Sequence, residues 1–394
     1  MVASIIIALV LASGKLQPPS KQDPLRDDDL ILDCFRLSSN GTRLAIAGGS
    51  QKGGDWKVLD LKDGRCIVNG LERAQRCTGA HAICLSPDTW LMAVGGNRNR
   101  LFLINANTGN LVWDMTNEGH VGAVTDLHFT PDSNFLISVG TDMMLRIWDI
   151  KNKKAQAVFR FTSVNPNFNQ WKSPLYVERA KRIHEVQGKY YLISHSGLHP
   201  DGKTFAVAGD EDGNIPFLDL PSGRVTKTIK AKNTTAAAVQ FTSDGKWLLV
   251  GGSMDKGIIE IWDHENEKLV CSMGRHDWSV IHLALSPDKK TLITGGVSDG
   301  FRVWDVASRK EKFSYFTKDD PRLPRIKIDP ESQRKYVEDK VRSAGVAFLP
   351  DGRTFLVAPH WSLWKAEIYF HDTETGRPVD FRAAAKRASE CQKK

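Results

Sequence analysis

One histidine, one serine and one aspartate near the middle of the chain have the residue types of a hydrolytic triad: His120, Ser138 and Asp142. A serine nucleophile needs a histidine to take its proton and a carboxylate to orient that histidine, so the set could hydrolyse an ester or an amide. Ser286-Pro-Asp-Lys289 also matches the Ser-x-x-Lys pattern of another class of serine enzymes. The Gly-x-Ser-x-Gly, His-Glu-x-x-His and Gly-x-Gly-x-x-Gly motifs are absent from the sequence. Whether either serine set can act depends on the elements that position it.

Residues that could hold a metal do not have the required spacing. Asp210-Glu211-Asp212 resembles the start of a calcium loop, but the twelfth position is Pro221 instead of Glu. The six cysteines include no Cys-x-x-Cys pair, and His81, His120, His195 and His360 are irregularly spaced. We therefore predict no metal and no cofactor. Cys66 and Cys77 could close a small disulfide loop in an exported protein, and the favoured alternative is that both are free thiols.

A short turn recurs seven times between apolar segments. The copies are Ser39-Asn40-Gly41, Pro87-Asp88, Pro131-Asp132, Pro200-Asp201-Gly202, Ser243-Asp244-Gly245, Pro287-Asp288 and Pro350-Asp351-Gly352. Proline sets φ for the first turn position, and Asp or Gly tolerates the next, so each copy predicts a hairpin between two strands.

A second marker closes each repeat: Leu59-Asp60, Ile104-Asn105, Trp148-Asp149, Leu218-Asp219, Trp262-Asp263, Trp304-Asp305 and His371-Asp372. Most intervals between markers match the period of a four-stranded propeller blade, and two intervals carry an insertion. The short apolar segments lack a helical period. We therefore predict an all-β fold, a seven-bladed β-propeller of four-stranded antiparallel blades.

The repeats resemble the WD-repeat family, most fully in the third, which reads Gly119-His120, Ser138, Asp142 and Trp148-Asp149. This resemblance implies a buried hydrogen-bond brace that joins the inner three strands of a blade through Trp148, Ser138, His120 and Asp142. In the sixth repeat the corresponding set is His276, Thr294 and Trp304, with Ser298 in place of the aspartate. The apparent triad is then a structural brace, and Ser286 belongs to a repeat turn. The resemblance also implies a protein-binding surface.

The two long connections, near 151–190 and 307–342, carry net charges of +7 and +4, whereas the whole chain carries +8. Connections from the last strand of one blade to the first strand of the next emerge on one face of a propeller. We therefore expect both insertions to flank the mouth of the central channel and make it basic and aromatic, suited to an acidic protein partner. The residues expected to bind this partner are Trp171, Lys172, Tyr176, Arg179, Lys181 and Arg182. The alternative is that both insertions are solvated loops packed back on the blades.

The ends of the chain differ in composition from the repeats. Residues 1–14 contain an apolar run too short to span a bilayer, which is typical of a secretory signal peptide, so we expect export, with a cytoplasmic protein as the alternative. Residues 15–30 read as a polar linker, 31–382 as the propeller and 383–394 as a basic tail. Arg377–Phe381 would supply the outer strand of the last blade, which leaves open how the ring is sealed.

Together these patterns predict a non-enzymatic scaffold that binds another protein through one face of the propeller. The alternative is an exported propeller hydrolase or oxidoreductase with its site in the central channel. We expect a monomeric propeller within a complex, without a transmembrane span. Nucleic acid is not the expected partner, because no base-stacking motif repeats along the chain.

Overall fold

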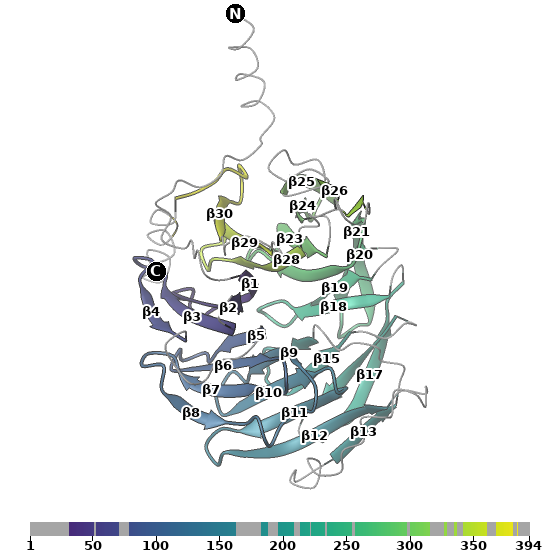
Figure 1. Cartoon of the computed structure of the whole chain (residues 1–394). Helices are drawn as coiled ribbons and strands as arrows, with labels where there is room; N and C mark the ends of the chain where they lie inside the picture. Colours follow the sequence, from purple (N-terminus) through teal and green to yellow (C-terminus); the bar gives the residue numbers. More distant parts are fainter. Residues whose placement is uncertain are drawn as a thin grey trace, which may run out of the picture.

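The protein is a ring of seven sheets that follow one another in chain order, and all their strand pairs except one in blade 3 are antiparallel (Figure 1). The fold is therefore the predicted seven-bladed β-propeller. This computed structural model describes residues 31–50, 53–70, 79–162, 183–187, 196–208, 213–220, 222–232, 235–253, 257–297, 300–315, 327–328, 335–336, 342–360, 368–380 and 384. Residues 1–30, with the proposed signal peptide and linker, lie outside these ranges.

In each blade the strands run in sequence order from the central channel to the rim. Blade 1 contains β1 (Ile31–Leu37), β2 (Arg43–Ser50), β3 (Gly53–Asp60) and β4 (Cys66–Asn69). Blade 2 contains β5 (Ala80–Leu85), β6 (Leu91–Gly96), β7 (Leu101–Asn105) and β8 (Leu111–Asp114). Blade 3 contains β9 (Val124–Phe129), β10 (Phe135–Gly140), β11 (Met144–Asp149), β12 (Lys154–Thr162) and β13 (Ile183–Gln187). Blade 4 contains β14 (Ser196–Leu198), β15 (Thr204–Val207), β16 (Asn214–Asp219) and β17 (Arg224–Lys230).

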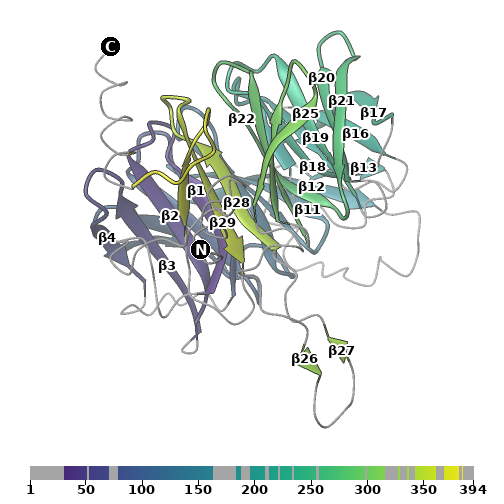
Figure 2. The same cartoon turned by 90° about the horizontal axis from the view of Figure 1, so that it is seen from above.

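The remaining blades keep this order. Blade 5 contains β18 (Ala236–Phe241), β19 (Trp247–Gly252), β20 (Gly257–Asp263) and β21 (Lys268–His276). Blade 6 contains β22 (Val280–Leu285), β23 (Thr291–Gly296), β24 (Phe301–Asp305) and β25 (Lys310–Tyr315). Blade 7 contains β28 (Arg342–Phe348), β29 (Thr354–His360) and β30 (Tyr369–Asp372). The short pair β26 (Lys327–Ile328) and β27 (Lys335–Tyr336) lies between blades 6 and 7 in the chain and stands away from the blades in Figure 2.

The recurrent turns join the first and second strands of the blades by one repeated set of hydrogen bonds. In blade 6 the Ser286 hydroxyl donates to Asp288 Oδ1 at 2.6 Å, and the Asp288 carboxylate accepts the Lys290 N–H at 3.1 Å. Thr130 and Asp132 form the same pair in blade 3. Lys289 contacts Asp244 of the neighbouring blade, whereas Ser286 is bonded to Asp288 within its own turn. The serine and lysine of the Ser-x-x-Lys match are therefore not paired with each other.

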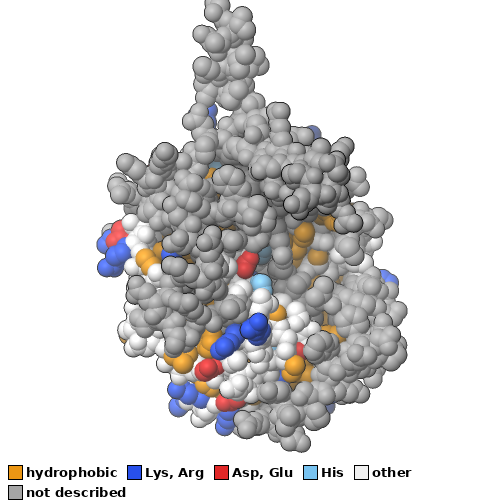
Figure 3. All heavy atoms as spheres, in the orientation of Figure 1, with side chains coloured by type: hydrophobic (Ala, Val, Ile, Leu, Met, Phe, Trp, Pro, Cys, Tyr) orange, Lys and Arg blue, Asp and Glu red, His pale blue; other side chains and the backbone are white. Residues whose placement is uncertain are grey.

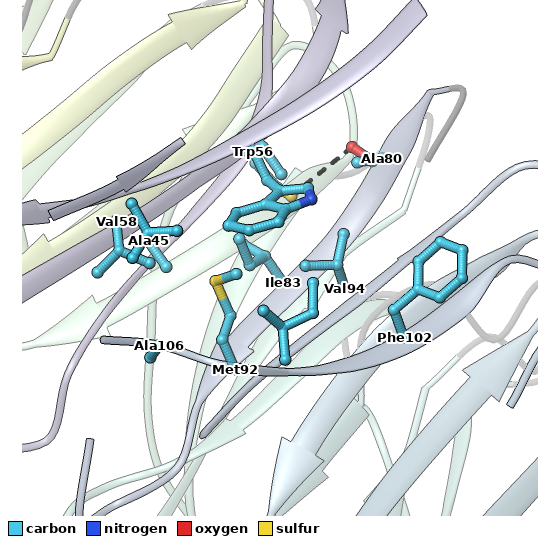
Figure 4. Packing of buried hydrophobic residues seen from close by; sticks show 13 residues of the cluster. Ala45, Trp56, Val58, Ala80, Ile83, Met92, Val94, Phe102 and Ala106 are labelled. Atoms are coloured by element: carbon cyan, nitrogen blue, oxygen red, sulfur yellow. Dashed lines mark hydrogen bonds between the residues drawn. The ribbon is translucent and has the colours of Figure 1, made fainter. Parts of the chain in front are cut away.

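Apolar side chains fill the spaces between neighbouring blades. Figure 4 shows the cluster between blades 1 and 2, where the fully buried Trp56 ring lies beside Ile83, Val94 and Ala80. Alternate strand residues point to opposite faces of a blade, so each sheet buries both of its faces against neighbours. The propeller therefore has a series of cores between blades.

The ring closes by packing between blade 7 and blade 1. One cluster contains Leu32, Phe35 and Leu44 of blade 1 with Leu356, Phe370 and other residues of blade 7. Blade 7 completes its own outer edge, as expected, through a bridge between His371 and Pro378 and a hydrogen bond from Val379 N–H to Phe370 O at 2.9 Å. Ala384 is fully buried in the same cluster, so this packing extends into the segment that the sequence suggested was a tail.

Blade 3 carries a fifth strand. β13 pairs in parallel with the outer strand β12, in the register Val158 to Ile183. The end of the first insertion therefore lies on the rim of blade 3, where it covers the edge of the sheet. The prediction that the insertions flank the channel mouth is therefore wrong for residues 183–187, because their backbone pairs with β12 at the edge of the sheet.

Candidate functional site

The four residues of the blade 3 set form a continuous chain of hydrogen bonds. The Trp148 indole N–H donates to Ser138 Oγ at 2.8 Å, Ser138 Oγ lies 2.8 Å from His120 Nε2, and His120 Nδ1 lies 2.8 Å from Asp142 Oδ1. The order of bonds is that of a catalytic triad. However, Trp148, Ser138 and His120 are all fully buried, so the serine hydroxyl is closed to a substrate. The bonds instead tie strands β10 and β11 to the connection that leads into β9.

Blade 6 has a shorter version of this chain, and blade 5 has a different one. His276 Nε2 lies 2.7 Å from Thr294 Oγ1, which accepts the Trp304 indole N–H at 2.9 Å. Ser298, the residue in place of the aspartate, lies outside the described residues. In blade 5 the Trp262 indole N–H donates at 2.9 Å to Glu260, a fully buried carboxylate two residues earlier on the same strand. Sequence reasoning missed Glu260, although its place on the Trp262 face of β20 was a usable signal.

The pKa of the Asp142 carboxyl lies below its usual range. Burial raises this pKa, but the charge and hydrogen bond of His120, the Val121 N–H and the charge of Arg146 together outweigh burial. Val121 N–H donates to Asp142 Oδ2 at 2.9 Å.

We expect this carboxylate to make the stability of the protein depend on acid. A folded-state pKa below the unfolded value of about 3.9 contributes stability above that value, and this stability is lost as the pH falls through the folded pKa. Urea unfolding between pH 7 and pH 3 should therefore show a fall in the free energy of unfolding at the acid end. Asp142→Asn should flatten the acid part of this curve, and an equally steep curve for the variant would contradict the assignment.

The inner strands of blades 1 and 3 to 7 line a central channel with a volume of about 630 Å³. Its wall includes Arg36 of blade 1, Asp126 and His128 of blade 3, Ser196 of blade 4 and Gln240 of blade 5. Much of the remaining wall is apolar. The channel is thus large enough for a small ligand, and its polar groups decide what it can do.

A second serine, histidine and aspartate meet on this wall. The buried Asp126 carboxylate accepts Ser196 N–H and Ser196 O–H, both at 2.9 Å, and lies 3.0 Å from His128 Nε2. Arg36 Nη2 lies 3.5 Å from its other oxygen. Because a carboxylate only accepts, His128 Nε2 carries the proton and cannot take one from Ser196 Oγ, which lies 3.3 Å from that same nitrogen. The cluster joins blades 1, 3 and 4 but is not arranged as a triad.

Sequence reasoning did not identify this cluster. Counting back from the recurrent turns places Asp126 at a position where blades 2 and 5 have Ala82 and Ala238, so a charged residue there was a usable signal. Its partners could not be predicted, because Arg36 and Ser196 come from different blades.

Part of the basic charge that the sequence assigned to the two insertions lies in the blades. Lys151, Lys153, Lys154 and Arg160 belong to the last turn and outer strand of blade 3, and Arg309, Lys310 and Lys312 hold the same place in blade 6. The prediction that the basic excess lies in two inserted loops is therefore wrong. The predicted insertions begin directly after the markers that end the third strands of blades 3 and 6. They therefore include the fourth strands of these two blades. Phe159 and Phe161 also lie in β12.

The six residues expected to bind a partner, Trp171, Lys172, Tyr176, Arg179, Lys181 and Arg182, lie outside the described residues. Among the described residues, basic side chains also lie in a turn between a second and a third strand. In blade 2 this turn exposes Arg98 and Arg100. Figure 3 shows Lys and Arg side chains together near the middle of the described part of the face seen in Figure 1.

The described ranges show neither a metal-binding cluster nor a membrane-spanning helix. These contain no group of three or more His, Cys, Asp or Glu side chains placed to hold a metal ion. No helix among the same residues is long and apolar enough to cross a membrane. Cys66 is exposed, and its suggested disulfide partner, Cys77, lies outside the described residues.

Comparison with known proteins identifies the repeats. The family model "WD domain, G-beta repeat" matches residues 112–149, 223–263 and 267–305. Each match begins at or near the outer strand of one blade and ends at the Asp that closes the third strand of the next, and the three blades that it ends in contain Trp148, Trp262 and Trp304.

Several curated proteins are similar to the chain. Apoptotic protease-activating factor 1 of Mus musculus is 26% identical over 301 residues, which cover 73% of this chain and 23% of that protein. The guanine nucleotide-binding protein subunit beta of Oryza sativa subsp. japonica is 22% identical over 303 residues, covering 65% of this chain and 79% of the relative. Target of rapamycin complex subunit wat1 of Schizosaccharomyces pombe is 25% identical over 258 residues, which cover 64% of this chain and 70% of that protein. The chain thus spans about a quarter of the length of the apoptotic relatives.

The ring of seven blades, the Trp-Ser-His-Asp chain and the matched repeats agree on one class of protein. The chain is a seven-bladed β-propeller that contains WD repeats.

Proposed function

We propose that this protein is a non-enzymatic scaffold that binds another protein through one face of its propeller, as a single propeller within a complex. The observation that carries the proposal is the ring of WD repeats, which the chain shares with relatives named as subunits of assemblies. A propeller of this kind is a rigid support for exposed turns, and such turns commonly carry binding residues.

The main alternative is an exported enzyme with its site in the channel. The chemistry of the channel wall favours the scaffold. The Asp126 carboxylate on that wall contacts Ser196, His128 and Arg36, and these contacts link blades instead of forming a catalytic triad. Metal analysis of the purified protein, together with an assay for hydrolysis of ester and lactone substrates, separates the two functions.

We further propose that the partner is acidic and contacts the first insertion, and that the protein is exported. Replacing Lys172, Arg179, Lys181 and Arg182 by Glu should lower recovery of partners in affinity capture about tenfold or more, because like charges would then face one another across the interface. Capture from the native host with mass spectrometry measures this loss.

The matched control changes the same amount of charge elsewhere. Lys62, Lys246, Lys268 and Arg377 are exposed on turns of the opposite face or beside them, and their replacement by Glu should leave recovery unchanged. Equal recovery with both variants would rule out the insertion as the binding site.

A further inference from the structure

The outer strand of blade 4, β17, is an exposed sheet edge. Within the described part of the chain it pairs with β16 alone. Five of its seven residues are exposed, and they include Val225, which exposes 44% of its surface. An edge of this length that carries an exposed apolar side chain is a template for pairing with another chain.

The backbone groups that face outward can be assigned from the register. Ala231 N–H donates inward to Gly213 O at 2.9 Å, and Lys230 and Thr228 lie opposite Asn214 and Pro216. Because bonding alternates along an antiparallel strand, Lys230 and Thr228 direct their N–H and C=O groups away from β16.

The molecule itself shows how such an edge can be covered. In blade 3, which is next in the ring, the outer strand β12 is paired with a fifth strand, β13. Blade 4 has an outer strand in the same position in its sheet, but none of the described residues adds a fifth strand there. A blade of this propeller can therefore accept an added strand at its rim.

The charge of β17 restricts what can pair with it. Residues 220–232 contain Arg224, Lys227, Lys230 and Lys232 and no acidic residue. Lys227 is bonded to His264 O, whereas Arg224 and Lys230 are exposed. Other outer strands differ from β17 in length or charge. The strands β4 and β8 are shorter, and β25 includes an acidic residue. In β21 the cations lie only near the two ends of the strand.

A second copy of the chain does not suit this edge. Antiparallel pairing of two copies centred on Lys227 would place Arg224 opposite Lys230, and like charges directly opposite one another destabilise a sheet. We propose that β17 is the docking edge for an extended, acidic segment of a protein partner, which adds to blade 4 as a fifth strand. This inference rests on the proposed scaffold function and specifies the chemistry of one partner.

A defined peptide tests the proposal on the full chain. The probe is a fluorescein-labelled peptide of seven alternating Glu and Val residues, and binding is measured by fluorescence anisotropy. We expect saturable binding that weakens as salt is raised. A peptide with Lys in place of Glu should not bind, and an N-methylated version of the Glu peptide should bind about tenfold more weakly, since it lacks N–H groups for strand pairing.

Two variants separate charge from backbone pairing. Lys230→Glu should weaken binding about tenfold by replacing an attractive cross-strand pair with a repulsive one. Its control is Lys268→Glu, the same change at an exposed residue of β21 in the next blade, which should bind as the wild type does. Thr228→Pro should weaken binding by removing an outward N–H, and proline is tolerated on an edge strand. Thermal unfolding of each variant checks that it is folded.

Three results would overturn the inference: equal binding by Lys230→Glu and the wild type, equal binding of the Lys and Glu peptides, or a dimer in sedimentation velocity that Thr228→Pro dissociates. The last result would assign the edge to a second copy. If native partners are still captured by Lys230→Glu as well as by the wild type, the docking edge is refuted while the scaffold function stands.

Discussion

Replacing Ser138 by Ala should lower the free energy of unfolding by about 2–4 kcal/mol, because two buried groups lose their partner at once. The Trp148 indole N–H and His120 Nε2 both bond to the Ser138 hydroxyl, and both side chains are fully buried. Neither group can turn to water without opening the blade. Urea unfolding followed by tryptophan fluorescence measures the loss.

The chain provides a matched control for this variant. Blade 6 uses Thr294 where blade 3 uses Ser138, with the same bonds to histidine and tryptophan. Ser138→Thr keeps the hydroxyl and should cost much less than Ser138→Ala. If both variants have the wild-type stability, the hydrogen-bond chain does not hold the blade together.

The fold could be predicted because each blade is encoded within one short stretch of sequence. The turn at Pro131-Asp132 and the marker at Trp148-Asp149 lie in the same hairpins that they stabilise, so their spacing gives the number of blades directly. The blade 3 hydrogen bonds are local in the same sense, since Ser138 lies across the β10–β11 pair from Arg146, two residues before Trp148.

The channel cluster could not be predicted in this way. Arg36 and Asp126 are 90 residues apart in the sequence and meet only because the ring brings their inner strands to one channel. The charge of the outer strands was misplaced for a related reason. The end of the third strand has a recognisable marker, whereas the fourth strand has no sequence signature. Lys154 and Arg160 of β12 were therefore assigned to the first insertion.

Two sets of serine, histidine and aspartate show how position decides chemistry. His120 uses both ring nitrogens, one for Ser138 and one for Asp142, but the set is sealed from solvent. His128 is partly exposed to the channel, yet Ser196 and Asp126 both lie at its Nε2. One set has the bond order of a catalyst without access, and the other has access without the bond order. Both are better explained as links between strands or blades.

Phe35→Ala should lower the free energy of unfolding by about 3–5 kcal/mol by leaving a cavity where the ring closes. Phe35 is 2% exposed in the cluster shared by blades 1 and 7. A Cβ added to Gly345 of blade 7 would lie 2.6 Å from the Phe35 ring, so the two blades are in close contact there. Within the described residues the two blades are held by such packing, without an exchanged strand.

The location of the damage distinguishes a closure residue from an ordinary core residue. Leu127 is equally buried, but in the cluster shared by blades 2 and 3, which are also consecutive in the chain. Hydrogen exchange of Phe35→Ala should show lost protection in both β1 and β28, the first and last inner strands, because separating them opens the ring. Leu127→Ala should lose protection mainly around β9, since the chain still joins its blades. If Phe35→Ala leaves β28 protected, contacts other than this cluster close the propeller.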